Sequence, residues 1–268
     1  MRRWSASKVE AVNDDQNGIR IGLSGWSNPA WRSGFYKGVP QRLWLAHCAA
    51  HFNTVEVNAT FHRMLKQASY ARWRAETPDS FVFAIKGNRV VTHFRLLKDP
   101  AAPIATQKDN SAALGNKLRV VLWQLPERLY KDIDRLASFA RALAVWTGVR
   151  HAVEFRHDTW FDDETAGLLA EHGLAVCISD AADWPLWDRV TTNLVYIRLH
   201  GAECTYHSRY DDDALNSWAQ RIKTWRDERR AVYVYFDNDA EGQAPYDALR
   251  LVDLLKLERP PAYAAEAR

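Results

Sequence analysis

The stretch Leu118-Arg-Val-Val-Leu-Trp-Gln124, the segment 132–147 and the stretch His151-Ala-Val-Glu-Phe-Arg156 together decide the fold. The two short stretches are rich in β-branched and apolar residues, which favours β-strands. The segment between them is long enough for a helix, and its apolar residues have helical spacing. A strand, a helix and a strand in this order make a βαβ unit with parallel strands. Near-continuous apolar strands of this kind indicate a sheet that is covered on both faces.

The same unit recurs along the chain, and eight units favour a closed barrel over an open doubly wound sheet. No GxGxxG motif follows the first strand, so a dinucleotide-binding fold lacks its main support. The 268 residues suit one α/β barrel, which typically has about 250 residues. The sequence therefore predicts a single-domain (β/α)8 TIM-type barrel over residues 18–268. The predicted strands are 19–26, 54–58, 81–86, 118–124, 151–156, 174–180, 194–200 and 231–236. Helices are expected from Pro40 onwards and at 67–76, 105–115, 132–147, 162–172, 211–228 and 244–256, with an irregular connection at 181–193.

Composition narrows the class of protein. A net charge of +3 is too small to indicate nucleic-acid binding by itself. The three cysteines, Cys48, Cys177 and Cys204, include no CxxC pair, which is typical of a reducing compartment. No apolar run is long enough to cross a membrane, and residues 1–17 lack the apolar core of a signal peptide. We expect a cytoplasmic protein with a flexible N-terminal extension at 1–17 and no membrane partner.

Polar side chains stand at the end of each predicted strand. In a TIM barrel the active site lies at the C-terminal face, where strand ends and the following loops meet. Residues two apart on a strand share a face. Three pairs of this kind are Glu56 with Asn58, Glu154 with Arg156, and Arg198 with His200. We expect Glu56, Glu154 and Lys86 to be catalytic. The expected ligand-binding residues are Trp26, Asn58, His93, Gln124, Arg156, Asp180, Arg198, His200 and Asn238.

Several motifs in order resemble the YecE-like family, a domain of unknown function found in bacteria and archaea. They are Ile21-Gly-Leu-Ser-Gly-Trp26, Phe52-Asn-Thr-Val-Glu-Val-Asn58, Phe83-Ala-Ile-Lys86, Thr92-His93, Leu122-Trp-Gln-Leu-Pro126, Glu154-Phe-Arg156, Tyr196-Ile-Arg-Leu-His-Gly201, Arg209-Tyr210 and Tyr235-Phe-Asp-Asn238. The resemblance covers nearly all of 19–256. It implies a TIM-type barrel and supplies no reaction. Leu23 and Asp237 depart from the family pattern, so we take Asn238 rather than Asp237 as the ligand contact.

The mixed charges leave several chemistries open. Lys86, Arg156 and Arg198 suit an anionic ligand, since guanidinium groups bind phosphate or carboxylate through two parallel hydrogen bonds. The same cations disfavour a tight metal site, and no HExxH spacing is present. Glycosidase chemistry would need Glu56 and Glu154 to flank one bond, and Lys86 could form a Schiff base if its pKa is lowered. A structural alternative is a Glu56–Lys86 salt bridge with a buried Glu154–Arg156 network.

The preferred hypothesis is a protein that binds or converts a small anionic ligand, phosphorylated or nucleotide-like, at the C-terminal face. If it is an enzyme, we expect a hydrolase, a lyase or an isomerase. A nucleic-acid-binding or processing protein and a non-catalytic ligand sensor are the alternatives. Binding to nucleic acid would depend steeply on salt. The sequence identifies no cofactor and leaves the oligomeric state open. It predicts that Arg156→Ala or Arg198→Ala abolishes ligand binding without unfolding the barrel.

Overall fold

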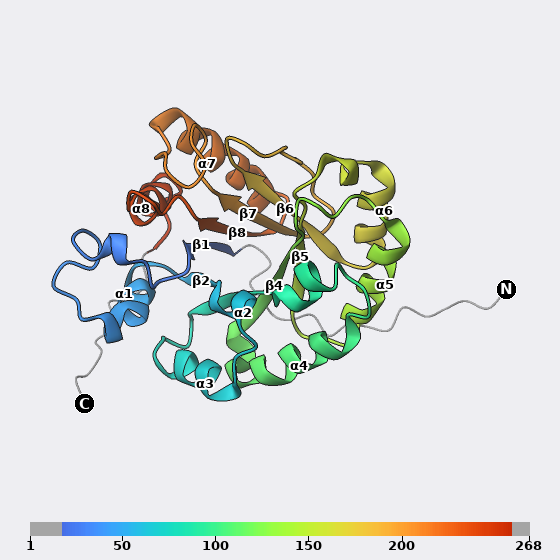
Figure 1. Cartoon of the computed structure of the whole chain (residues 1–268). Helices are drawn as coiled ribbons and strands as arrows, with labels where there is room; N and C mark the ends of the chain where they lie inside the picture. The colour runs from blue at the N-terminus through green and yellow to red at the C-terminus, as the bar shows by residue number, and fades with distance from the viewer. Residues whose placement is uncertain (1–17, 259–268) are drawn as a thin grey trace.

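A computed structural model describes residues 18–258, so the predicted extension at 1–17 lies outside the described residues. The described chain forms a closed barrel of eight parallel strands in sequence order, with β8 paired to β1. Helices surround the strands on all sides (Figure 1). The strands are β1 Ile19–Ser24, β2 Thr54–Val57, β3 Val82–Lys86, β4 Leu118–Gln124, β5 Arg150–Glu154, β6 Leu174–Asp180, β7 Leu194–Leu199 and β8 Ala231–Phe236. The predicted (β/α)8 TIM-type barrel is confirmed.

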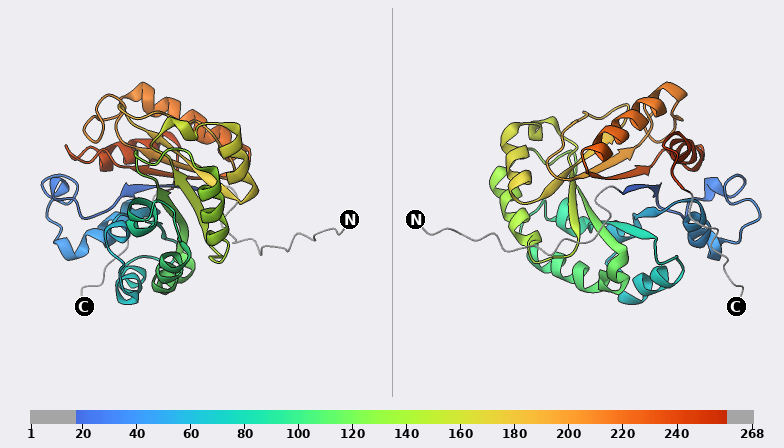
Figure 2. Two further views of the ribbon diagram at one scale, coloured as in Figure 1. Left: turned by 45° about the vertical axis from the view of Figure 1, so that its right-hand side comes forward. Right: turned by 180° about the vertical axis from the view of Figure 1, so that it is seen from behind.

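The helices alternate with the strands and cover the outside of the barrel, as the two views of Figure 2 show. They are α1 Trp44–His51, α2 Ala59–His62, α3 Gln67–Ala75, α4 Ala101–Ser111, α5 Ile133–Leu143, α6 Asp163–Glu171, α7 Asp212–Asp227 and α8 Ala244–Leu254. The side chains of Asp162 and Asp211 cap α6 and α7, because each accepts a hydrogen bond from a first-turn amide. The connection 181–193 contains no helix or strand, as predicted.

Several predicted boundaries differ from the structure by two residues or more, and two of them show why. The helix expected at 105–115 begins four residues earlier, at Ala101. Pro103 lies in its first turn, where its missing N–H costs no hydrogen bond within the helix. It gives way to a 3-10 segment at Ala112–Lys117, in which Gly115 has a φ of 59°. The strand expected at 151–156 ends at Glu154, and the chain leaves the sheet there. None of the helices in residues 18–258 is both long enough and apolar enough to cross a membrane.

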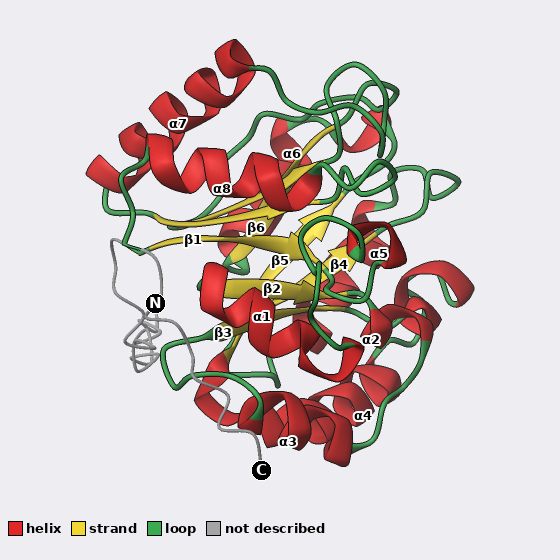
Figure 3. Cartoon of the chain, turned by 90° about the vertical axis from the view of Figure 1, so that its left-hand side faces the viewer, coloured by secondary structure: helices red, strands yellow, loops and turns green. Residues whose placement is uncertain are grey.

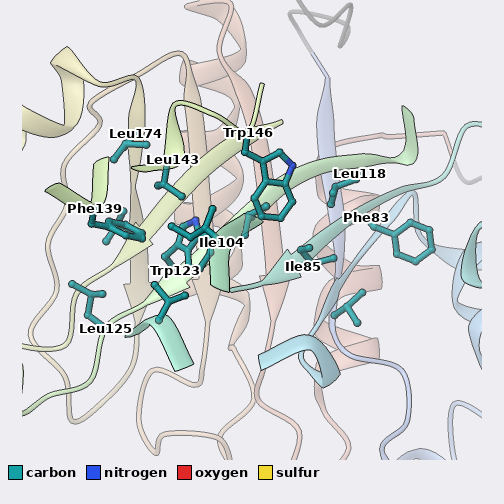
Figure 4. Close-up of a cluster of buried hydrophobic side chains, with 14 of the residues drawn as sticks. Phe83, Ile85, Ile104, Leu118, Trp123, Leu125, Phe139, Leu143, Trp146 and Leu174 are labelled. Atoms are coloured by element: carbon teal, nitrogen blue, oxygen red, sulfur yellow. The ribbon is translucent and has the colours of Figure 1, made fainter. Parts of the chain in front are cut away.

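Side chains alternate between the barrel interior and the layer under the helices. Aliphatic and aromatic residues fill the interior, among them Ala84, Leu122, Ala152, Tyr196 and Tyr235. The opposite faces of the strands pack against the helices. Figure 4 shows part of this outer layer, with ten labelled side chains that include Phe83, Ile85, Trp123 and Phe139.

This alternation decides which polar side chains reach the interior at the C-terminal ends of the strands. In Figure 3 the strand arrowheads point toward one end of the barrel, where the connecting loops gather. The interior positions nearest to that end are Ser24, Glu56, Lys86, Gln124, Glu154, Ser179 and Arg198. The candidate site is built on this layer.

Candidate functional site

Arg198 on β7 lies at the centre of the polar layer and is only 1% exposed. Its Nη2 lies 2.9 Å from Glu56 Oε1 and 2.8 Å from Asp237 Oδ2, and its Nη1 lies 3.1 Å from Glu154 Oε2. Nη2 also donates to Ser24 Oγ at 2.9 Å, and Nε donates to Glu56 at 3.2 Å. Burial lowers the pKa of Arg198, but the three carboxylates outweigh burial and raise it. The guanidinium is therefore a fixed cation whose N–H groups are largely used within the protein.

Glu56 on β2 is fully buried and its two oxygens are both engaged. Ser24 Oγ donates to Oε1 at 2.6 Å, and Tyr196 OH donates to Oε2 at 2.6 Å. Asn58 lies one layer further out and donates through Nδ2 to Ser24 Oγ at 2.9 Å and to the Ser24 carbonyl at 3.1 Å. A buried carboxylate requires hydrogen bonds and a counter-charge, and Glu56 has both.

Glu154 on β5 is held in the same way from the other side of the barrel. Arg156 Nε donates to Glu154 Oε1 at 2.6 Å, and Ser179 Oγ donates to the same oxygen at 3.2 Å. Burial raises the pKa of Glu154, but Arg156 and then Arg198 outweigh burial, so its pKa lies well below the ordinary value. The predicted Glu154–Arg156 network is present, and it keeps this carboxyl ionised.

Lys86 on β3 differs from its neighbours in the polar layer. No carboxylate oxygen of residues 18–258 lies within 4.0 Å of its Nζ, so the alternative Glu56–Lys86 salt bridge is not formed. Nζ instead lies 4.7 Å from the centre of the Phe61 ring. The Lys86 carbonyl accepts from Thr60 Oγ1 at 2.7 Å and from Gln107 Nε2 at 3.1 Å, which fixes the end of the strand. Burial, and then the charge of Arg198, lower the pKa of Lys86 to about 8.

Asp237 and His200 lie beside Arg198 and complete a cluster of charged side chains with Glu56, Glu154 and Arg156. His200 is fully buried, and its Nδ1 lies 3.0 Å from Asp237 Oδ2. Burial raises the pKa of Asp237, but Arg198 and then His200 outweigh it and lower the pKa to about 2. Burial, and then Arg198, lower the pKa of His200. The family departure at Asp237 therefore places a carboxylate inside the cluster, where it is the third anion facing Arg198.

An aromatic wall of Trp184 and Tyr206 borders the cluster on the side of β6 and β7. The guanidinium carbon of Arg156 lies 3.2 Å from the centre of the Trp184 ring. Trp184 also contacts His200 edge to face at 4.6 Å, and Tyr206 lies 5.6 Å from Trp184. Tyr206 has a φ of 68°, and its backbone N–H donates to the His200 carbonyl. Stacking and ion pairing together fix the orientation of Arg156.

Cations gather on the side of β3 to β5. His93 lies on the π-helical turn Val90–Phe94, and irregular turns of this kind are frequent at functional sites. Its Nδ1 lies 2.9 Å from Thr92 Oγ1. Burial, and then the charges of Lys86, Arg128, Arg156 and Arg89, lower the pKa of His93 to about 4. This side of the mouth of the barrel, the open end at the C-terminal ends of the strands, therefore has a positive potential.

The structure places two of the predicted ligand-binding residues away from the cluster. Asp180 lies on the outward face of β6 and accepts from Trp218 Nε1 at 3.2 Å. Asn238 follows β8 with the outward alternation, and its Nδ2 donates to Asp247 Oδ2 at 2.9 Å. The residue before each of them, Ser179 and Asp237 respectively, points into the barrel interior instead.

Trp26 and Gln124 lie at the rim of the barrel. Trp26 follows β1 and contacts Trp73 edge to face at 5.4 Å, and it also lines a pocket beside the cluster. Gln124 occupies an inward position at the end of β4, and its Nε2 donates to the Leu125 carbonyl at 2.9 Å. Among residues 18–258, no three His, Cys, Asp or Glu side chains converge in a way that would hold a metal ion.

Four polar residues of the cluster were missing from the predicted site, namely Ser24, Ser179, Tyr196 and Asp237. All four have the inward alternation of their strands or continue it, so strict counting by two from the apolar interior residues could have found them. The aromatic contacts of Trp184 and Tyr206 had no such signal, because both lie on loops.

Known proteins match this chain over most of its length. The model of a family described as "Protein of unknown function DUF72" matches residues 20–267. The chain is 24% identical to the UPF0759 protein YunF of Bacillus subtilis (strain 168), over 90% of this chain and 95% of that protein. It is 29% identical to the UPF0759 protein YecE of Escherichia coli O157:H7, over 85% of this chain and 89% of that protein.

Solved structures match as well. A DUF72 family protein from Thermotoga maritima MSB8 superimposes with a TM-score of 0.78 at 25% identity, covering 89% of this chain and 99% of that one. A DUF72 family protein from Enterococcus faecalis V583 has the same fold, with a TM-score of 0.78 at 20% identity and coverage of 91% and 97%. Since the family model covers nearly the whole sequence, this chain belongs to the YecE-like DUF72 family of proteins of unknown function.

Proposed function

We propose that the C-terminal mouth of the barrel binds a small organic anion, phosphorylated or nucleotide-like, beside Lys86 and Arg156, and that Lys86 exchanges a proton with it. The observation that carries the proposal is the environment of Lys86. Its ammonium group is half-buried in the polar layer, yet no carboxylate of the described residues lies within 4.0 Å. A partly buried cation without a carboxylate in contact is unfavourable, and an anionic ligand would supply the counter-charge.

The distribution of charge supports an anion site on one side of the cluster. Arg198 is already opposed by Glu56, Glu154 and Asp237, so this guanidinium has little attraction left for a ligand. Lys86 and Arg156 lie toward the side where cationic charges also depress the pKa of His93. Arg156 is held by Glu154 and Trp184, and such a preorganised guanidinium can contact phosphate or carboxylate without further ordering.

The pKa values support Lys86 as the group that moves a proton. The lowered pKa of Glu154 leaves that carboxylate ionised and unable to supply a proton near neutral pH. The Lys86 pKa of about 8 is close to the range in which general acids and bases work best. Proton transfer next to a bound anion suits an isomerase or a lyase better than a glycosidase, which needs a protonated carboxyl group.

The test is calorimetric binding of phosphate monoesters and small carboxylates to the wild-type chain and to Lys86→Met. Lys223→Met, on the outer helix α7, is the matched control. We expect Lys86→Met to weaken anion binding at least tenfold, which is about 1.4 kcal/mol. At pH 8.5 binding should also take up a proton, because the anion favours charged Lys86. Equal affinity in the wild type and Lys86→Met, or oligonucleotide binding with a steep salt dependence that survives this substitution, would overturn the proposal.

A further inference from the structure

A pocket of about 320 Å³ lies beside the charge cluster, at the ends of β1, β2 and β8. Trp26 and Trp31 from the segment after β1 form part of its wall, Asn58 follows β2, and Asp239 follows β8. Its volume is near the lower end of the roughly 300–1,000 Å³ that small-molecule sites occupy. Lys86 and Arg156, the residues of the proposed anion site, do not line this pocket, so the pocket is separate from that site.

Three buried polar atoms of the pocket residues have no hydrogen-bond partner among residues 18–258. They are Trp31 Nε1, Asn58 Oδ1 and Asp239 Oδ1. Trp31 itself is only 1% exposed, so its indole N–H is a buried donor without an acceptor. Buried polar groups are almost always hydrogen-bonded, so three unpartnered atoms in residues that line one pocket make this pocket the strongest candidate for a second ligand site.

The hydrogen bonds of Asn58 determine which of its atoms is left for a ligand. Its Nδ2 donates to the Ser24 carbonyl, which can only accept, so the amide orientation is fixed by chemistry. Oδ1 is then the unpartnered atom, and Asn58 offers the pocket an acceptor. Burial, and then the charge of Asp237, raise the pKa of Asp239 well above its ordinary value, so this carboxyl group is protonated more readily than an exposed aspartate.

The pocket is lined by the tryptophans Trp26 and Trp31, by the amide of Asn58 and by the carboxyl group of Asp239, and no cation lines it. This set does not suit an anion. It suits a flat, uncharged ring that stacks on or packs against indole and carries both a donor and an acceptor on its edge. Nitrogen heterocycles of the nucleobase type have these properties.

A short chain of hydrogen bonds joins the pocket to the charge cluster. Asn58 donates to Ser24 Oγ, Ser24 Oγ donates to Glu56 Oε1, and Arg198 Nη2 donates to Ser24 Oγ. Ser24 and Asn58 thus border both compartments. We infer that this pocket is the subsite for an uncharged heterocyclic ring, so that the ligand carries a nucleobase-like ring as well as its anionic group. The position of the anionic group rests on the proposed function, whereas the ring subsite stands on the pocket itself.

The experiment is calorimetry with three kinds of probe: the four common ribonucleosides, their 5′-monophosphates, and ribose 5-phosphate. Trp31→Phe removes the indole donor and keeps an aromatic ring, and Trp225→Phe on α7 is the matched control. Thermal unfolding of each variant checks that it is folded. We expect at least one nucleoside to bind the wild type, and Trp31→Phe to weaken it roughly three- to tenfold, the effect of one hydrogen bond. Ribose 5-phosphate binding should not change in Trp31→Phe.

Lys86→Met separates the two proposals. It should weaken the nucleotide and ribose 5-phosphate while leaving the nucleoside affinity unchanged. If no nucleoside binds, or if Trp31→Phe leaves nucleoside affinity unchanged, the ring subsite is wrong, whatever Lys86→Met does to phosphates. If nucleosides bind through Trp31 but no probe responds to Lys86→Met, the ring subsite stands and the proposed anion site fails.

Discussion

Arg198 on β7 reaches across the barrel interior to Glu56 on β2, with Nη2 2.9 Å from Oε1, and both side chains are at most 2% exposed. Glu154 and Asp237 contact the same guanidinium. The centre of the polar layer is thus an ion cluster that the fold itself satisfies. Lys86, at its edge, is the cation for which the described residues provide no carboxylate within 4.0 Å. This difference separates residues that hold the site from residues that can engage a ligand.

The first prediction concerns stability at the centre of the cluster. Arg198→Met leaves buried carboxylates without their shared counter-charge, and breaking a buried pair in this way costs about 3–5 kcal/mol of unfolding free energy. Urea denaturation measures the change. Arg226→Met is the control, because its ion pair with Asp227 is half-exposed and is worth about 0–1 kcal/mol. A loss in Arg198→Met no larger than in the control would contradict the structural role. The sequence alone predicted that Arg198→Ala would abolish binding without unfolding.

The second prediction is that substitution of Lys86, unlike that of Arg198, does not lower the free energy of unfolding. Lys86→Met replaces a half-buried ammonium group, which has no ion pair within 4.0 Å in the described chain, with an apolar side chain of similar length. We expect the free energy of unfolding at pH 7 to stay unchanged or to rise, as is common when an unfavourable buried charge is removed. Urea denaturation at pH 7 decides this point. A loss comparable to that of Arg198→Met would show that Lys86 is a structural member of the cluster.

The third prediction is a pH dependence with a definite sign. The pKa of Lys86 is lowered to about 8 in the folded chain and returns to about 10.5 on unfolding. Between these values the unfolded chain binds more protons, so Lys86 makes stability rise with pH from about 8 to about 10.5. The wild type should therefore gain stability relative to Lys86→Met across this window. A difference between the two chains that stays constant with pH would contradict the lowered pKa.

The fourth prediction concerns acid. Arg198 and His200 outweigh burial and lower the pKa of Asp237 from 3.8 to about 2 in the folded chain. The resulting stability is present above about pH 4 and is lost as the pH falls toward 2, because the carboxylate must then be protonated. Asp237→Asn should flatten the acid limb of a stability–pH curve in this window. An acid limb that is equally steep in the wild type and the variant would show that other carboxylates dominate.

The fifth prediction tests the contacts that orient the Arg156 guanidinium. Its guanidinium stacks on Trp184 and donates through Nε to Glu154. Lysine cannot reproduce a planar, stacked and forked contact, so Arg156→Lys should weaken anion binding roughly tenfold although the charge is kept. Calorimetry with a phosphate monoester measures the loss. Full affinity in Arg156→Lys would mean that only the charge at this position matters.

The sequence predicted the fold well because each strand is an apolar run bounded by helices. It predicted the ends of strands less well, since Trp26 and Arg156 follow β1 and β5 rather than belonging to them. Apolarity falls gradually at a strand end, whereas the sheet ends where hydrogen bonding stops.

The structure brings most of the predicted site residues together, and the two that lie away from the cluster have a common physical cause. Asp180 and Asn238 are polar and end their strands, but alternation turns both outward. The sequence could not predict that Arg198 uses most of its N–H groups within the protein. These contacts depend on how closely β2, β5 and β7 approach one another across the closed barrel. The contact of Trp184 with Arg156 depends on an irregular loop, whose path no periodicity specifies.

Lys86 is proposed to be the cation whose counter-charge a bound anion supplies. Carbon-13 NMR of the lysine Cε groups measures its protonation directly, with the Lys86 resonance assigned by its absence from Lys86→Met. We expect a Lys86 pKa of about 8 in the ligand-free chain and a rise in this pKa when a binding phosphate monoester saturates the site. A Lys86 resonance that titrates near the ordinary lysine value of 10.5, or that does not respond to any phosphorylated or carboxylate ligand, would contradict it.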